Sequence, residues 1–293
     1  TLRRTFAAAR HVTVHRLALP MLRLRPARAG ALRLARTRYR YGRPRAPVLD
    51  RVLNVSTPAV EERAASAVAL VDLFFALCET SHVGVFVEAG AKEASASVRA
   101  VGASIPEVIA FEANPFTYRR FAHDVQAAGV DYRHAALSEE AGEATFLVRR
   151  RGDGSPIADG QGSLLVRPDH EPGYVEATVA AVRLDDAVDA GARAALWVDV
   201  EGAVAEVLGG GRQLLERTDV AIVEVEEVTR WVGQRWLARD VVDQLSRAGL
   251  RAVARDMQSR WQFNIVFVRD GLLDAPPVHE HIRAWRSTTP TPT

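Results

Sequence analysis

Residues 194–202 read Ala-Ala-Leu-Trp-Val-Asp-Val-Glu-Gly, an apolar run that ends in two acids. The apolar residues predict a strand that is buried on both faces and extends over 194–200. Asp199 and Glu201 stand two residues apart, so their side chains point the same way on a strand. Buried carboxylates are costly without partners, which makes this pair the strongest candidate for a functional site. The alternative is a structural role in capping the following helix.

Outward from this run, short apolar segments alternate with helical ones. Such alternation predicts an α/β fold, in which helices cover both faces of a mostly parallel sheet. The expected strands are 83–87, 108–111, 132–137, 194–200, 220–225, 250–254 and 263–268, and the expected helices are 94–101, 116–128, 203–215 and 234–248. An earlier helix, beginning near residues 56–58, is expected to turn one side to the core through Val68, Val71, Phe75 and Leu77.

Acids also follow the other predicted strands, at the edge where α/β sheets bind ligands. The first strand runs into Glu88-Ala89-Gly90, and the second ends in Glu112. An acid after the second strand is placed to accept hydrogen bonds from two ribose hydroxyls, although Glu112 has an alternative role as a helix cap. The first turn has a single glycine, so the three-glycine fingerprint of NAD and FAD sites is absent. The fifth strand adds Glu224, Glu226 and Glu227.

Taken in order, these segments resemble the motifs of FkbM-type methyltransferases. The matching stretches are 85–91, 111–115, 184–186, 198–202 with Val207-Leu208-Gly209-Gly210 after it, and 263–268. They span about residues 83–269. The resemblance implies a Rossmann-like methyltransferase fold, with a mostly parallel seven-stranded sheet, helices on both faces and an antiparallel last strand. It also implies S-adenosylmethionine-dependent O-methylation of a hydroxyl on a saccharide or secondary metabolite.

The resemblance assigns the donor-binding residues. Glu88 and Gly90 would flank the methionine end of the donor, and Glu112 would hold its ribose. Asn114 belongs to the same motif as Glu112 and is counted with it. The adenine would be bordered by Ala136 and Leu137.

By the same resemblance, Asp199 and Glu201 would lie close to the transferring methyl group and the acceptor. We expect one of them to take the acceptor's proton, with Glu224 as a third candidate base. His134 and His170 are alternatives. A divalent cation that bridges Asp199 and an acceptor hydroxyl is a further hypothesis, because hard cations prefer oxygen ligands.

Several positions depart from the family's usual residues. The family has Asp at 88, Asn at 92, Gly at 94, Pro at 113, Lys at 197 and Glu at 204, where this chain has Glu88, Lys92, Ala94, Ala113, Trp197 and Val204. These changes favour a second hypothesis, a non-catalytic methyltransferase fold retained as a binding or scaffolding module. A third hypothesis, an RNA methyltransferase, draws on the many arginines, but only Tyr39 and Tyr41 stand among them as stacking residues.

Charge divides the chain unevenly. Residues 1–51 hold fourteen arginines and one acid, a formal +13, and the rest holds −11, which gives the total of +2. We expect a basic extension over 1–51, a helical lead-in over 52–82, a methyltransferase domain over 83–272 and a C-terminal tail over 273–293. The extension is expected to pack on the body or stay partly disordered, and contact with an anionic membrane surface or glycan is the alternative.

Composition excludes several other classes of protein. Cys78 is the only cysteine, so neither a disulfide framework nor a four-cysteine zinc site is available. No apolar run reaches ~18 residues, and we expect a cytoplasmic protein without a membrane-spanning helix. We expect a small-molecule or glycan acceptor and no specific nucleic acid, and the sequence leaves the oligomeric state open. The glycine-rich stretch 149–176 predicts a long polar loop that lacks the acid spacing of a calcium-binding EF-hand.

Overall fold

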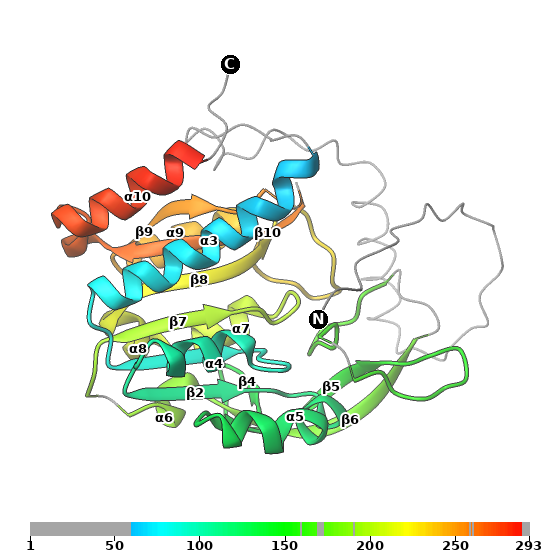
Figure 1. Ribbon diagram of the computed structural model, residues 1–293. Helices are drawn as coiled ribbons and strands as arrows, with labels where there is room; N and C mark the ends of the chain where they lie inside the picture. Colours follow the sequence, from blue (N-terminus) through cyan, green and yellow to red (C-terminus); the bar gives the residue numbers. More distant parts are fainter. Residues whose placement is uncertain are drawn as a thin grey trace, which may run out of the picture.

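The computed structural model describes residues 60–288 apart from 159, 169–172, 190, 258 and 260. Its main sheet has seven strands in the order β3-β2-β1-β7-β8-β10-β9 (Figure 1). Strand β10 pairs antiparallel with both neighbours, whereas β1, β2, β3, β7 and β8 pair in parallel. The bounds are β1 Val85–Ala89, β2 Glu107–Phe111, β3 Asp131–Arg133, β7 Ala194–Val198, β8 Thr218–Glu226, β9 Leu250–Arg255 and β10 Gln262–Arg269. The predicted mostly parallel sheet with an antiparallel last strand is confirmed.

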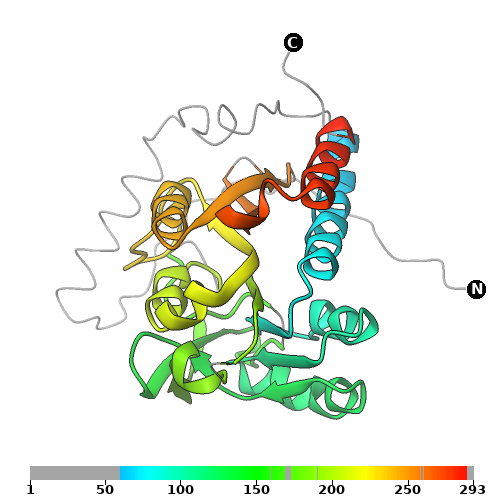
Figure 2. The ribbon, with the colours of Figure 1, turned by 90° about the vertical axis from the view of Figure 1, so that its left-hand side faces the viewer.

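Helices cover both faces of this sheet (Figure 2). One face carries α3 (Val60–Thr80), α4 (Ser95–Gly102), α5 (Pro115–Ala127) and α10 (Pro276–Thr288). The other carries α6 (Leu184–Ala187), α7 (Val204–Gly209), α8 (Arg212–Arg217) and α9 (Ala238–Arg247). All five residues of β1 are buried, as expected for a central strand whose sequence is apolar without alternation.

Helix α3 turns Phe75, Leu77 and part of Val71 to the core as predicted, but its buried side is centred elsewhere. Its core-facing residues are Leu70, Phe74, Leu77 and Cys78, which recur at helical spacing. Val68, expected in the core, lies away from that stripe and is 62% exposed. Phe75 is buried and stacks on Phe86 of β1, so the helix still packs on the sheet as predicted.

A second, three-stranded sheet was not predicted. It has the order β4-β6-β5, from β4 (Ala136–Leu137), β6 (Tyr174–Val182) and β5 (Gly142–Arg149). The single strand predicted over 132–137 is therefore wrong. Arg133 pairs with Phe111, the last residue of β2, and beyond that point the first sheet offers no partner. Ala136 pairs instead with Ala181 of β6.

Two predicted helices differ in extent. The helix predicted over 203–215 is broken into α7 and α8, because three consecutive glycines at 209–211 separate them. The helix predicted from residue 234 begins only at Ala238. The loop predicted over 149–176 is shorter, since Arg149 ends β5 and Tyr174 begins β6.

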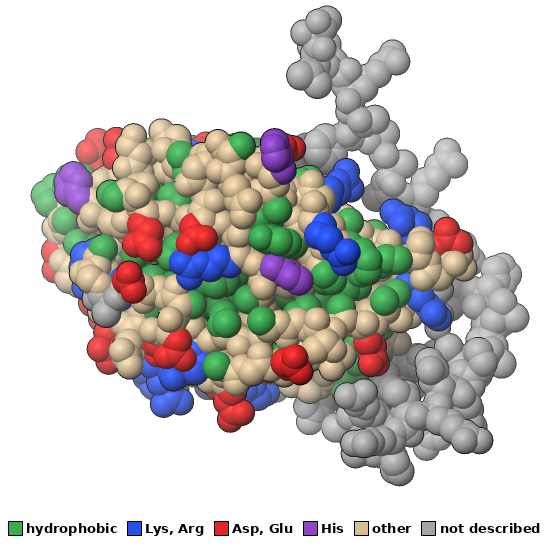
Figure 3. All heavy atoms as spheres, turned by 90° about the horizontal axis from the view of Figure 1, so that it is seen from below, with side chains coloured by type: hydrophobic (Ala, Val, Ile, Leu, Met, Phe, Trp, Pro, Cys, Tyr) green, Lys and Arg blue, Asp and Glu red, His purple; other side chains and the backbone are tan. Residues whose placement is uncertain are grey.

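Helix α10 lies within the segment expected as a C-terminal tail. Its Val278, Ile282 and Trp285 are buried, and it packs against α3, where Thr80 Oγ1 lies 3.1 Å from His281 Nε2. Seen from below, the surface mixes acidic and basic side chains around a band of apolar ones (Figure 3). None of the helices in the described part of the chain combines the length and apolar composition needed to cross a bilayer.

Candidate functional site

A cleft opens at the carboxyl ends of the central strands, next to the second sheet. It encloses about 540 Å³ of space, part of it open to solvent. Six of the nine predicted site residues line it: Gly90, Glu112, Asn114, Ala136, Leu137 and Asp199. The other three, Glu88, Glu201 and Glu224, lie outside its lining. The strand-end rule therefore placed the cleft correctly, and the structure divides the predicted residues between the cleft and its surroundings.

The turn after β1 packs tightly against the end of β7. The N–H groups of Gly90 and Ala91 both donate to the carbonyl of Phe111, at 3.0 and 2.9 Å. Gly90 has φ of +81°, and a Cβ built on it would lie 1.8 Å from the backbone oxygen of Asp199. Only glycine fits here, because any side chain would be strained and would also push the two strand ends apart.

Glu112 is the buried acid of the cleft, at 6% exposure. Its carboxylate accepts hydrogen bonds from the N–H of Lys92 at 2.7 Å and of Asn114 at 2.6 Å. Burial raises the pKa of Glu112 to about 7, and these two N–H groups oppose the rise. The alternative role as a helix cap is wrong, because the Asn114 side chain caps α5 by accepting from the N–H groups of Phe116 and Thr117.

Glu88 faces helix α4. Its carboxylate accepts hydrogen bonds from the backbone N–H and the hydroxyl of Ser97, and both residues are buried. Burial raises the pKa of Glu88 to about 8, although the Ser97 hydrogen bonds lower it. In this structure Glu88 therefore ties β1 to α4 and does not line the cleft.

The two first-turn departures leave the cleft open. The ammonium of Lys92 forms an ion pair with Glu93 at 3.0 Å, and its side chain runs against Gly160. Ala94 adopts φ of +52° immediately before α4, and its methyl group belongs to the hydrophobic core. Neither residue therefore obstructs the lining of the cleft.

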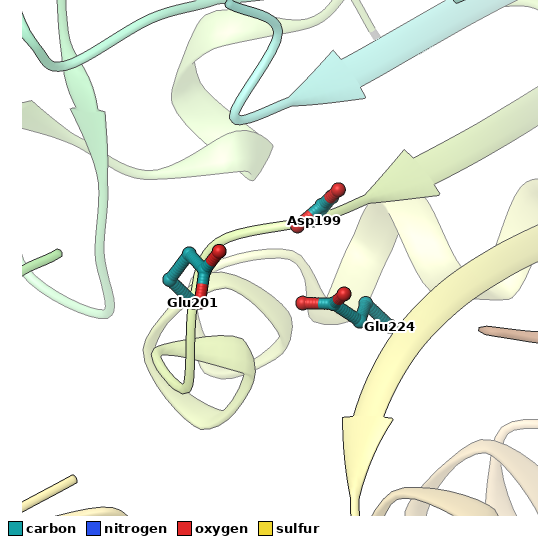
Figure 4. Close-up of side chains that lie close together, drawn as sticks. All are labelled: Asp199, Glu201 and Glu224. Carbon is teal, nitrogen blue, oxygen red and sulfur yellow. The ribbon is translucent and has the colours of Figure 1, made fainter. Parts of the chain in front are cut away.

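Asp199, Glu201 and Glu224 form an acidic cluster beside the cleft (Figure 4). One carboxylate oxygen from each lies within 4.8 Å of the others. Asp199 and Glu201 follow β7, and Glu224 lies near the end of β8. Asp199 belongs to both the cluster and the lining of the cleft, so it links the two.

Desolvation and mutual repulsion perturb all three acids. Burial raises the pKa of Glu201 to about 7, and the charge of Asp199 adds to the rise. The pKa of Glu224 lies well above its ordinary value, first through burial and then through repulsion by neighbouring carboxylates. Burial also raises the pKa of Asp199, while a hydrogen bond with Glu224 and the charge of Lys92 lower it. Burial therefore raises the pKa of every carboxyl group of the cluster.

Sequence reasoning missed the residues that surround this cluster. Gln262 of β10 donates to Glu224 at 2.8 Å, and Gln234 donates to Glu226 at 2.6 Å. The Ser163 hydroxyl donates to the backbone oxygen of Glu201 at 2.8 Å. Glutamines and serines follow no sequence pattern that marks them as partners of an acid. The structure shows this role through their hydrogen bonds, and for Gln262 also through its position opposite Glu226 on β8.

The second sheet and its loop supply a wall of the cleft that was not predicted. Phe146 of β5 lines it together with Gly160, Gly162 and Leu164. Of the alternative bases, His134 is exposed and stacks on Tyr118, and its Nε2 lies 3.2 Å from the backbone oxygen of Ala113. It therefore does not reach the cluster, while His170 lies outside the described residues.

Comparison with known proteins gives one family. The family model described as "Methyltransferase FkbM domain" matches residues 82–285. No curated protein matches the sequence as a whole.

Among solved structures, magnesium protoporphyrin IX methyltransferase from Synechocystis, with S-adenosylmethionine bound, is 12% identical. That alignment covers 83% of this chain and 95% of the other, with a TM-score of 0.39. The 1,6-didemethyltoxoflavin-N1-methyltransferase of Burkholderia thailandensis is 14% identical over 86% and 93% of the two chains, with a TM-score of 0.35. Similarities of this size do not extend to substrate or mechanism.

Proposed function

Because the chain belongs to the FkbM methyltransferase family, we propose that this methyltransferase uses S-adenosylmethionine to methylate a hydroxyl of a saccharide or secondary metabolite. The observation that carries the proposal is the cleft at the strand ends, with buried Glu112 and half-buried Asp199 both in its lining. A buried carboxylate at the end of the second strand of such a sheet is suited to ribose hydroxyls, and a second acid is available for proton transfer.

The residues of the cleft fit the donor. Each oxygen of Glu112 accepts one backbone N–H and retains a lone pair for a hydroxyl hydrogen bond. Ala136 and Leu137 offer an apolar wall for the adenine, and Phe146 extends it. Polar groups and apolar side chains therefore meet in one cleft, as a donor with a ribose and an adenine requires.

Asp199 is the residue that we propose as the base. S-adenosylmethionine, when bound, supplies a methyl group already activated by its sulfonium. The protein's tasks are then to align the acceptor and to remove its proton. Asp199 lines the cleft, and although burial raises its pKa, a hydrogen bond with Glu224 and the charge of Lys92 favour its ionised form. As the acceptor O–H bond breaks, its proton passes to Asp199. Glu201, which belongs to the same cluster, is the second candidate base.

The donor site makes a direct prediction for Glu112→Gln. Each carboxylate oxygen of Glu112 accepts one backbone N–H, whereas the glutamine amide has a single acceptor oxygen. In the variant the NH₂ group would face the other N–H, and that hydrogen bond would be lost. Loss of charge-assisted hydrogen bonds costs roughly 1.5–3 kcal/mol, so we expect S-adenosylhomocysteine to bind about 10–100-fold more weakly. Calorimetry measures this affinity directly.

The matched control is Glu107→Gln. Glu107 lies on the same strand, but at its exposed amino end, away from the cleft. We expect its affinity for S-adenosylhomocysteine to equal that of the wild type. Equal affinity in all three proteins would contradict the role of Glu112, and absence of binding to the wild type would contradict the proposed function.

The acceptor class needs its own experiment. The full chain, incubated with donor carrying an isotopically labelled methyl group, is offered a panel of saccharides and phenolic natural products. We expect the label on an oxygen as a methyl ether, located by mass spectrometry. Label on nitrogen or carbon would contradict O-methylation while leaving methyl transfer intact.

The remaining expectations stay proposals. We propose a cytoplasmic location, with peripheral contact to an anionic surface through the basic residues 1–51, which lie outside the described residues. If that segment serves only location, a chain without it binds S-adenosylhomocysteine as tightly as the full chain does. A divalent cation also stays a proposal, and it concerns the acidic cluster.

A further inference from the structure

The carboxylates of the acidic cluster have no direct ion-pair partner among the described residues. Within the described part of the chain, no lysine or arginine forms an ion pair with Asp199, Glu201 or Glu224. The neighbouring Arg230 directs its guanidinium to the Gln262 side chain, which in turn donates to Glu224. Gln262 therefore stands between the cluster and Arg230, and the basic side chains whose charges reach these carboxylates, Lys92, Arg167 and Arg230, do so from beyond ion-pair distance.

A fourth acid provides an independent sign that a ligand belongs here. Glu226 is 2% exposed and stands two residues beyond Glu224 on β8, so both side chains lie on the same face of the strand. Gln234 donates to Oε2 of Glu226, but its buried Oε1 has no hydrogen-bond partner among the described residues. Gln262 lies opposite Glu226 across β10 and β8, and its side chain donates to Glu224, which places Glu226 beside the cluster. Buried acceptors without partners are rare, and a cation with its bound water would satisfy this one.

We propose that Asp199, Glu201 and Glu224 bind a hard divalent cation through one oxygen each. Two ligands of one ion are separated by at most twice the metal–oxygen distance. That limit is about 4.2 Å for Mg²⁺ and about 4.6–5.2 Å for Ca²⁺. The three oxygens lie within 4.8 Å of one another, so small movements of these side chains would bring them to the spacing of ligands around one such ion. Three carboxylate ligands select against soft, thiolate-preferring metals.

The location of the site gives the cation a role that rests on the proposed function. Asp199 also lines the cleft, so an ion held by the cluster lies beside the space offered to the acceptor. Three protein ligands leave about three positions of an octahedral ion for other oxygens. An acceptor with two neighbouring hydroxyls, such as a vicinal diol of a saccharide, would fill two of them and be held in one orientation.

The test is Mn²⁺ binding to the full chain. The protein is first treated with a chelator and dialysed, Mn²⁺ is then added, and the electron paramagnetic resonance signal of free Mn²⁺ measures how much is bound. We expect one ion per chain, displaced by Mg²⁺ or Ca²⁺. Glu224→Gln should weaken binding by at least about tenfold, since even outer-shell changes cost 10–100-fold. Glu143→Gln, a change of an exposed carboxylate on β5, should leave it unchanged.

Thermal unfolding shows whether Glu224→Gln is still folded, so that a loss of Mn²⁺ binding can be assigned to the missing ligand. Removing one of several repelling carboxylates should leave the melting temperature of metal-free Glu224→Gln at or above that of the wild type, whereas Mn²⁺ should raise only the wild-type value. Failure of millimolar Mn²⁺ to bind the wild type, or equal binding to wild type and Glu224→Gln, would overturn the proposal. Binding of S-adenosylhomocysteine in the presence of chelator is measured in parallel. It tests the proposed function separately, because the donor cleft does not need the ion.

Discussion

Gly90→Ala is expected to lower the free energy of unfolding by about 2–5 kcal/mol and to abolish binding of S-adenosylhomocysteine. A left-handed conformation costs a non-glycine residue roughly 1–2 kcal/mol, and forcing atoms into a packed site costs roughly 1–3 kcal/mol more. Both costs apply, because Gly90 has φ of +81° and the new methyl group would lie 1.8 Å from the backbone oxygen of Asp199. Relief of that overlap must separate the ends of β1 and β7, which together form the floor of the cleft.

Urea unfolding and calorimetry measure the two effects. Gly102→Ala is the control, because no atom lies within 4 Å of a Cβ at that position and Gly102 is the last residue of α4. There alanine should be neutral or stabilise by up to about 1 kcal/mol. If Gly90→Ala unfolds like the wild type and still binds the ligand, the close approach of the two strand ends is not needed for either property.

The free energy of unfolding is expected to fall by about 3 kcal/mol or more as the pH rises from about 5 to about 8. Glu88 is one of the main contributors, because burial raises its pKa from an ordinary value near 4.5 to about 8. Between those two values the folded protein binds a proton that the unfolded chain has released. Stability is therefore fully present at low pH and is lost as the pH rises toward 8. Each pKa unit corresponds to about 1.4 kcal/mol, and the raised pKa of Glu112, near 7, acts in the same direction.

Glu88→Gln isolates this contribution. The glutamine oxygen can accept the same hydrogen bonds from Ser97 and never ionises. We expect the variant to match the wild type near pH 5 and to exceed its stability by about 3 kcal/mol near pH 8, as measured by urea unfolding at several pH values. Glu143→Gln, at an exposed position, should follow the wild type throughout. Parallel curves for Glu88→Gln and the wild type would show that Glu88 is ionised in the folded state at both ends of the range.

The main sheet was predictable because its strands are buried on both faces, and uniform apolar runs such as Ala194–Val198 record that burial directly. The second sheet was not. Strands β5 and β6 have mixed burial, and single charged or hydroxyl side chains interrupt their apolar residues, so neither gives the uninterrupted apolar run of a central strand. Strand β3 ends at Arg133 because its neighbour β2 ends at Phe111. The local sequence around residue 133 does not contain this information.

The residues of the candidate site were also predictable only in part. Acids at strand ends stand out because charge is unexpected after a buried strand, and this placed Glu112 and Asp199 at the cleft. Glu88 has the same signal, yet Ser97 turns it into a structural residue, and the position of that serine becomes meaningful only when α4 packs beside β1. Gln262 and Gln234 escaped prediction because neutral amides are common at surfaces and reveal their role only through their partners.

Lys92 also provides a spectroscopic handle. It is the only lysine in the chain, its side chain is 44% exposed, and it runs against Gly160 in the wall of the cleft. Reductive methylation with ¹³C-formaldehyde would therefore place a single labelled lysine amine beside the cleft, and its chemical shift would report occupancy by ligand or ion. An arginine-rich protein with one lysine thus carries its own site-specific probe, with no engineered cysteine and no assignment of a crowded spectrum.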